Sequence, residues 1–329
     1  MAAEDMTIRI ETLLSGGRHA EAARLLIAAA AAGQTAALAQ LASWRIAGSI
    51  IRRDLAKARA LLAAAAAKGD SASALLHASF LASGTGGEAQ WPAALAALEA
   101  LAATAPEAAA QLRLIGAMDL DSDGFPVRRM PLRPLADSPY AAAAEGFLTA
   151  AECAWLIAAA EPRLQPSVVA DPATGRMIAH PIRSSDAAMF GVFAEDLAVN
   201  AINRRIAALS GTAPAQGEPL QVLRYRPGGE YKPHMDALPA EPNQRILTVL
   251  VYLSDDYEGG ETRFVRTGLS FRGKAGDALL FRNAGADGRA DPLSLHAGLP
   301  VTRGVKYLAS RWIRAGTFSY PPPRPLLDI

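Results

Sequence analysis

The sequence predicts two domains, an α-helical repeat array followed by a closed or sandwiched antiparallel β-structure. Alanine supplies 40 of the first 120 residues, whereas 20 of the 22 prolines and 17 of the 20 aromatic residues follow residue 120. The alanine-rich part repeats at a fixed spacing, and short strand-like segments separated by turn residues fill the chain from residue 220 onward. A length of 329 residues suits about two domains of ordinary size.

The helical prediction depends on an internal repeat. The segments EAARLLIAAAAAGQTAALAQL and KARALLAAAAAKGDSASALLH align with Gly33 over Gly69, and a third copy puts Ala105 at the same position. Alanine and leucine favour helix, and a glycine after an alanine run ends one. These segments, roughly residues 15–116, resemble Sel1-like repeats, which are relatives of the tetratricopeptide repeat. The resemblance implies a helical solenoid that binds a protein partner; the alternative is a helical domain that only steadies its neighbour.

The remaining boundaries follow from composition and local signals. We expect the helical array over residues 1–116, a proline-rich linker over 117–144, the β-rich domain over 145–316 and a proline-rich tail over 317–329. A capping box of Thr149 and Glu152 predicts a helix through residue 160, and a second helix is expected over 194–209. The tail favours polyproline II and is either a plain tail, a substrate of the protein itself or a mimic of a substrate. Strands are predicted at 220–225, 245–254, 261–265, 269–271, 277–281 and 305–313.

Charge and apolar patterning exclude several classes of protein. The chain carries 33 basic and 32 acidic residues, so it lacks the basic field that non-specific nucleic-acid binding needs. No apolar run reaches the 18 or so residues of a membrane span, and Glu4, Asp5 and Glu11 interrupt any export signal. The single cysteine, Cys153, suits a reducing compartment. We therefore expect a cytoplasmic protein with neither nucleic acid nor membrane as partner.

A metal site is indicated by the string RYRPGGEYKPHMDAL. Residues i and i+2 of an extended chain share a face, so His234 and Asp236 project an imidazole and a carboxylate into one space. A mononuclear iron site with two histidines and one carboxylate needs one more imidazole. Of the other histidines, two lie in the helical array and one in a predicted loop: His19, His77 and His180. His296 is therefore the remaining candidate for the third ligand.

A lysine ten residues after His296 indicates what the metal site binds. In the predicted strand GVKYLASRWI, Lys306 shares a face with Leu308, Ser310 and Trp312. A lysine on an inward face needs an anion, because an unpaired ammonium group in an apolar barrel is strongly disfavoured. Open metal positions near such a cation suit 2-oxoglutarate, which chelates iron at one end and pairs with Lys306 at the other.

Residues 145–315 resemble the iron(II)- and 2-oxoglutarate-dependent dioxygenases of the prolyl 4-hydroxylase group. The matching segments are GFLTAAEC, IRSSDAAMF, LQVLRYRPGGEYKPHMD, RILTVLVYLSDDYEGGETRF, GKAGDALLFRN and SLHAGLPVTRGVKYLASRWI. The resemblance implies a double-stranded β-helix, or jelly roll, with flanking helices. It implies Fe(II), 2-oxoglutarate and O2 as cofactor and cosubstrates, with ascorbate as a candidate reductant. Its pattern makes His234, Asp236 and His296 the iron ligands.

The same resemblance assigns the cosubstrate and substrate residues. Lys306 is implied as the partner of the distal carboxylate of 2-oxoglutarate, with Tyr225 and Thr262 in the same pocket. The residues that correspond to the peptide site of the group are Tyr231, Arg245 and Trp312, and Arg183 is a further candidate. Residue habit leaves other interpretations open. Both substrate-side aromatic residues could be ordinary core residues, the Arg245 side chain could lie on the surface beside Glu241, and Thr262 could simply favour a strand.

The implied activity is hydroxylation of a C–H bond in a peptide or protein side chain, with proline as the preferred target, and release of succinate and CO2. Three alternatives stay open. The same chemistry could act on a free amino acid, a small metabolite or a nucleobase. The barrel could be vestigial in a repeat-bearing adaptor, which a measurement of iron-dependent CO2 release would decide. A zinc hydrolase could use the same three ligands, and a requirement for 2-oxoglutarate would exclude it.

Overall fold

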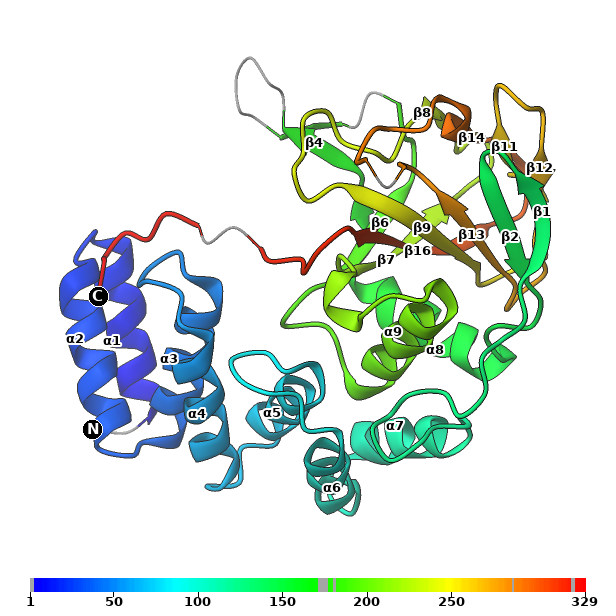
Figure 1. The fold of residues 1–329 in the computed structure, drawn as a ribbon. Helices are drawn as coiled ribbons and strands as arrows, with labels where there is room; N and C mark the ends of the chain where they lie inside the picture. The colour runs from blue at the N-terminus through cyan, green and yellow to red at the C-terminus, as the bar shows by residue number, and fades with distance from the viewer. Residues whose placement is uncertain (1–2, 171–176, 180–181, 286, 321–322) are drawn as a thin grey trace. The chain divides into compact units, whose positions relative to one another are not determined.

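The computed structural model describes residues 3–170, 177–179, 182–285, 287–320 and 323–329 (Figure 1). The chain divides into two compact units. The helical unit comprises Met1–Phe125, Glu195–Ala201 and Ser319–Ile329, and the β-sheet unit comprises Pro126–Ala194 and Ile202–Phe318. Among the described residues, no helix has both the length and the apolar character that a bilayer crossing requires.

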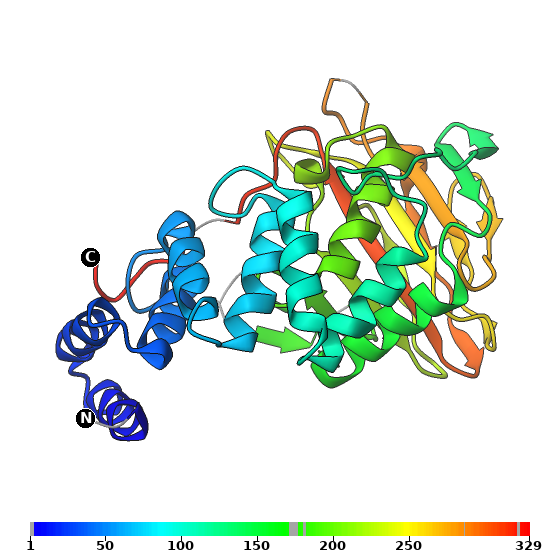
Figure 2. The same ribbon diagram turned by 90° about the horizontal axis from the view of Figure 1, so that it is seen from below.

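The helical unit is built from short helices that contact one another in chain order, as Figure 2 shows. Gly33 and Gly69 follow α2 and α4 with φ of 75° and 89°, so the helix ends predicted at these glycines are confirmed. Alanine and leucine form the core, with Leu26 and Ala22 fully buried. The helices are α1 (Ala3–Ser15), α2 (His19–Ala31), α3 (Thr35–Ala47), α4 (Leu55–Ala66), α5 (Ser71–Ser83), α6 (Trp91–Ala102) and α7 (Pro106–Gly116).

The β-sheet unit contains a large and a small antiparallel sheet. In the described residues the large sheet has the order β1-β2-β13-β9-β16-β7-β6-β3, and the small sheet has the order β12-β11-β14-β8. Strands β10 and β15 pair separately, as do β4 and β5. The strands of the large sheet are β1 (Arg133–Asp137), β2 (Tyr140–Ala144), β3 (Gln165–Pro166), β6 (Asp186–Phe190), β7 (Leu220–Tyr225), β9 (Arg245–Tyr252), β13 (Ala278–Arg282) and β16 (Lys306–Arg314). The others are β4 (Val168–Ala170), β5 (Met177–Ala179), β8 (Tyr231–His234), β10 (Glu258–Gly259), β11 (Thr262–Phe264), β12 (Ser270–Phe271), β14 (His296–Gly298) and β15 (Val301–Arg303).

The apolar side chains between the two sheets form the core of the β-sheet unit. Tyr252, Phe264 and Phe281 are fully buried there, and the rings of Phe264 and Phe281 meet edge to face with centroids 5.2 Å apart. The predicted helix after Thr149 is α8 (Ala150–Ala160), and its capping box is present. Most strands predicted after residue 220 agree with the structure to within one or two residues at each end.

Two predicted segments differ from the structure. The segment 117–144, expected as a linker, contains β1 and β2. Strand β1 forms one edge of the large sheet, and β2 pairs with β1 and β13. The run Ala141–Ala144 is fully buried, so the tertiary environment overrides the weak strand preference of alanine. The second helix, α9 (Leu197–Ser210), begins three residues later than predicted because the Asp196 carboxylate accepts a hydrogen bond from the Val199 amide at 2.7 Å.

Candidate active site

The pairing of β14 with β8 brings the two predicted histidines together. His234 is the last residue of β8, and in this register it lies opposite His296, the first residue of β14. Asp236 follows His234 by two residues. Antiparallel pairing of two strands that are distant in sequence therefore gathers two imidazoles and a carboxylate in one place.

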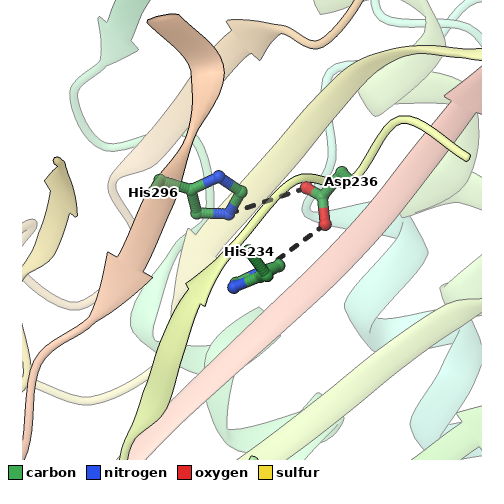
Figure 3. A group of neighbouring side chains, drawn as sticks. All are labelled: His234, Asp236 and His296. Atoms are coloured by element: carbon green, nitrogen blue, oxygen red, sulfur yellow. Dashed lines mark ion pairs between the residues drawn. The ribbon is translucent and has the colours of Figure 1, made fainter. Parts of the chain in front are cut away.

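The three side chains point toward one another (Figure 3). Nε2 of His234 lies 3.6 Å from Oδ1 of Asp236, and Nε2 of His296 lies 3.7 Å from Oδ2 of the same carboxylate. All three donor atoms fall within 4.8 Å of one another. Two neutral imidazoles and one carboxylate at such spacing fit a divalent transition metal and leave coordination positions open on one side.

Hydrogen bonds to backbone carbonyls fix both imidazoles. Nδ1 of His234 bonds the carbonyl of Lys232 and Nδ1 of His296 bonds the carbonyl of Ser294, each at 2.9 Å. A carbonyl accepts only, so each Nδ1 carries the proton and each Nε2 keeps its lone pair for a metal. Burial lowers the pKa of His296, which further favours the neutral ligand form.

The carboxylate of Asp236 is held by residues that sequence reasoning missed. Oγ1 of Thr248 donates a hydrogen bond to Oδ2 of Asp236 at 2.6 Å, and Nδ2 of Asn283 donates to Oγ1 of Thr248 at 2.8 Å. Burial alone would raise the pKa of Asp236, but His296, His234 and the Thr248 hydroxyl outweigh it and hold this pKa below its ordinary value. The available sequence signal was a lone threonine in the apolar strand RILTVLVY.

A pocket adjoins the three side chains and opens between the two sheets. Its walls come from β7, β9 and β16 of the large sheet and from β8, β11 and β14 of the small one. The sequence predicted that Lys306, Leu308, Ser310 and Trp312 share one face of β16. This prediction is confirmed, since all four residues line the pocket. The lining residues are Arg183, Leu223, Tyr225, Tyr231, His234, Asp236, Leu250, Thr262, His296, Gly298, Lys306, Leu308, Ser310 and Trp312.

Lys306 supplies a buried cation to the pocket. The residue is only 2% exposed and lies opposite Tyr225 in the pairing of β16 with β7. Its Nζ donates a hydrogen bond to the carbonyl of Gly260 at 2.7 Å. Burial lowers the pKa of Lys306 to about 7. An anion entering the pocket would offset this desolvation, so the site favours a ligand with a carboxylate.

Aromatic and hydroxyl groups surround the ammonium group. Nζ of Lys306 lies 5.5 Å from the ring centroid of Tyr225 and 5.3 Å from that of Tyr252, so both rings can stabilise the cation. The hydroxyl groups of Tyr252 and Thr262 are 2.9 Å apart and hydrogen bonded. Thr262 thus lines the pocket as expected from its position. Tyr252 was not predicted, because nothing in the sequence distinguishes it from other strand aromatics.

The predicted substrate residues do not all lie in the pocket. The ring of Tyr231 stacks on that of His234 with centroids 3.4 Å apart, and the guanidinium of Arg183 lies 5.4 Å from the Tyr231 ring. Trp312 also lines the pocket, whereas Arg245 does not. Both substrate-side aromatic rings therefore face the pocket, so neither is only a core residue.

Arg245 supports the pocket wall from behind. Its guanidinium lies 3.8 Å from the Trp312 ring centroid and makes two hydrogen bonds, of 2.6 and 2.9 Å, to the Glu218 carboxylate. The alternative of an exposed arginine beside Glu241 is wrong, because Glu218 takes that role. Glu218 is buried and also bonds Arg314 at 2.6 Å, and no sequence signal had identified it.

Two of the other histidines do not line this pocket. His19 and His77 lie in the helical unit, on α2 and α5. His180 is outside the described residues.

A family model and curated relatives match the part of the chain that contains this site. Residues 220–314 match the model of the 2OG-Fe(II) oxygenase superfamily. The chain is 37% identical to Prolyl 4-hydroxylase 1 of Arabidopsis thaliana over 218 residues, which are 60% of this chain and 77% of that protein. It is 38% identical to Probable prolyl 4-hydroxylase 10 of the same plant over 200 residues, 54% of this chain and 69% of that protein.

Solved structures are also similar to the chain. The viral collagen prolyl hydroxylase of Paramecium Bursaria Chlorella virus-1, crystallised as a 2OG complex, matches with 30% sequence identity and a TM-score of 0.45. The match covers 56% of this chain and 99% of the viral protein.

Proposed function

Since the chain belongs to the 2OG-Fe(II) oxygenase superfamily, in its prolyl 4-hydroxylase type, we propose that it hydroxylates a prolyl residue of a peptide or protein. It is a dioxygenase that uses Fe(II), 2-oxoglutarate and O2. The observation that carries the proposal is a single pocket with two imidazoles and a carboxylate at one part of its wall and a buried ammonium group at another.

His234, Asp236 and His296 hold Fe(II) in this proposal. Their donor atoms are close enough to share one ion. Each imidazole is fixed by a hydrogen bond to a carbonyl two residues earlier, and Asp236 by a hydrogen bond from Thr248. Bound Fe(II) supplies the oxygen chemistry, in which 2-oxoglutarate is decarboxylated to succinate and CO2 while one oxygen atom enters the substrate. The protein leaves coordination positions free for the cosubstrates and keeps them away from bulk water.

Lys306 binds the distal carboxylate of 2-oxoglutarate, and Tyr225 and Thr262 line the same part of the pocket. Within the described residues the ammonium group donates to the Gly260 carbonyl, which is neutral, so a ligand carboxylate would give it a counter-charge at hydrogen-bond distance. Such a charge-assisted bond contributes about 1.5 to 3 kcal/mol. A dicarboxylic acid with one end on the metal satisfies both groups at once.

The substrate peptide reaches the metal past Tyr231, Trp312 and Arg183. Aromatic rings offer flat apolar surfaces against which a prolyl ring packs well. Arg245 acts as a positioning residue here, because it holds the Trp312 ring from behind while Glu218 neutralises its charge. Ascorbate is proposed as the reductant that keeps the iron in the Fe(II) state.

The helical unit has its own part in the proposal. Gly33, Gly69 and Ala105 each lie between two helices, in the pairs α2–α3, α4–α5 and α6–α7. This agreement between the 36-residue period and the helix pairs supports Sel1-like repeats that bind a protein partner. A cytoplasmic location is also proposed, since the one cysteine, Cys153, is buried and has a pKa raised by burial to about 11.

A product assay tests the catalytic proposal. The protein is incubated with Fe(II), 2-oxoglutarate, O2 and a proline-containing peptide library, and products are examined by mass spectrometry. We expect peptides heavier by one oxygen atom, with the oxygen on proline and succinate formed in equal amount. The His234→Ala variant is the matched control and should give neither product. Hydroxylation of free amino acids but of no peptide would contradict the proposed substrate class.

A further inference from the structure

The tail of the chain is not a free extension of the β-sheet unit. Residues Ser319–Ile329 belong to the helical unit, and the end of the chain lies beside the first helices in Figures 1 and 2. It contacts the connection between α3 and α4, residues 48–54. The last residues therefore differ from the plain tail that the sequence favoured, because they are bonded to the helical unit.

Backbone hydrogen bonds hold the last residues of the tail. The amide of Leu326 donates to the carbonyl of Ser49, and the amide of Leu327 donates to the carbonyl of Ile50, each at 2.9 Å. Leu327 forms a parallel bridge with Ile51. Two residues further on, Nη1 of Arg45 donates to the carbonyl of Ile329 at 2.7 Å. Main-chain bonds of this kind give affinity independently of most side chains.

Side chains of the tail alternate between the helices and solvent. Pro325 and Leu327 are half-buried, and Leu327 packs against the core cluster that contains the fully buried Ile51. Leu326 is 60% exposed, and Asp328 is exposed as well. The helical unit thus contacts every second side chain of this segment, and it requires an apolar residue at the position of Leu327.

The site is also shaped for close approach of a proline. Gly48 ends α3 in the left-handed conformation, with φ of 71°. A Cβ at this position would lie 3.3 Å from Cγ of Pro323 and 2.8 Å from Cβ of Arg53. Any larger residue would crowd the segment PRPLL at its first proline. Gly48 therefore ends the helix and also leaves room for the bound tail.

We propose that residues 45–53 form a binding site for a peptide of the type Pro-x-Pro-x-Leu, and that the tail is its exchangeable occupant. The inference deepens, and rests on, the proposed partner role of the helical unit, and it is independent of the oxygenase reaction. Two main-chain bonds, one bond from Arg45 and one half-buried leucine hold the tail, while its exposed leucine and final isoleucine remain in solvent. Covalent attachment gives the tail a high effective concentration at the site. These few contacts are therefore enough to keep it bound.

The test uses the full chain with its tail released. In Leu327→Asp, a charge replaces the anchoring side chain, so the tail should leave the site. A fluorescent peptide PRPLLDI, with the sequence of residues 323–329, is titrated into the wild type, Leu327→Asp and Leu326→Asp, and binding is followed by anisotropy. We expect the Leu327→Asp chain to bind at least about tenfold more tightly than the other two, because their tethered tails compete. Circular dichroism shows whether each variant is folded.

Peptide variants make the test specific. PRPLDDI, changed at the Leu327 position, should lose binding to the released chain, whereas PRPDLDI, changed at the exposed Leu326 position, should keep it. Absence of PRPLLDI binding to folded Leu327→Asp, or equal binding of both altered peptides, would overturn the proposal. A wild-type dimer that Leu327→Asp converts to monomer would assign the site to the tail of a second copy and would also overturn it. Succinate formation is measured separately, so that loss of the proposed catalytic function is not mistaken for failure here.

Discussion

The two ends of the active-site pocket are prepared for their ligands in different ways. At the metal end, every donor side chain is fixed before a ligand arrives: the imidazoles by carbonyls and Asp236 by Thr248 and Asn283. At the other end, Lys306 is buried with the Gly260 carbonyl and two aromatic rings around it, and its pKa falls to about 7. The metal end is therefore preorganised, whereas the ammonium group at the cosubstrate end donates to a neutral carbonyl until a ligand carboxylate arrives.

The largest effect is expected at the metal end. His234→Ala removes one of three donors, so the iron content and 2-oxoglutarate-dependent succinate formation should both fall to background. Metal analysis of the purified variant and a succinate assay measure the two quantities. Full turnover by this variant would show that His234 is not a metal ligand. It would also contradict the proposed difference between the two ends of the pocket.

The next largest effect is expected at the cosubstrate end. Lys306→Ala removes a charge-assisted bond of about 1.5 to 3 kcal/mol, so the dissociation constant for 2-oxoglutarate should rise by about 10- to 200-fold. Calorimetric titration of the iron-loaded protein measures the constant. Iron affinity should stay unchanged, because Lys306 touches none of the three donors. An unchanged 2-oxoglutarate affinity would place the cosubstrate elsewhere.

The bracing of Asp236 can be tested separately. Thr248→Val keeps the volume of a fully buried residue but removes the hydroxyl that bonds the carboxylate. We expect the dissociation constant for iron to rise by about 10- to 100-fold, as for other outer partners of metal ligands. Thr262→Val is the matched control, because it removes a hydroxyl at the opposite end and should leave iron binding unaltered. Equal effects of the two variants on iron would show that the ends are not independent.

The smallest effect concerns pH. Burial lowers the Lys306 pKa to about 7, and a bound carboxylate raises it again, so binding above pH 7 requires uptake of a proton. Affinity for 2-oxoglutarate should be flat below pH 7 and fall by about five- to tenfold between pH 7 and pH 8. Lys306→Arg should lose this dependence, since a guanidinium keeps its charge throughout. A proton-uptake measurement by calorimetry in two buffers checks the sign directly.

The sequence predicted those parts of the fold whose local pattern agrees with their environment. Strands β7, β9, β13 and β16 alternate or run apolar between clear turn signals, so their positions were predictable. Strand β2 consists mainly of alanine, and only its pairing with β13 in a tight space makes it a strand. The short strands between residues 165 and 190 were missed for a similar reason, because their pairing with β7 or with each other decides their conformation.

The sequence predicted those site residues whose type is rare in the chain. It did not predict those whose role depends on strand register. Few histidines and one inward lysine suffice to indicate the metal and its cosubstrate. Thr248 and Tyr252 look like ordinary strand residues, and only the folded register brings their hydroxyl groups to Asp236 and Thr262. Arg245 was predicted as a substrate residue, yet Glu218, 27 positions away in sequence, turns it against Trp312.

Each histidine of the metal end obtains its orienting carbonyl from only two positions earlier in the chain. The correct tautomer is thus a local property of each strand end and does not wait for a distant segment to dock. Loss of the ion therefore leaves both imidazoles aimed as before. An iron-depleted molecule should recover by simple uptake from the cellular pool, without refolding and without help from a dedicated assembly factor.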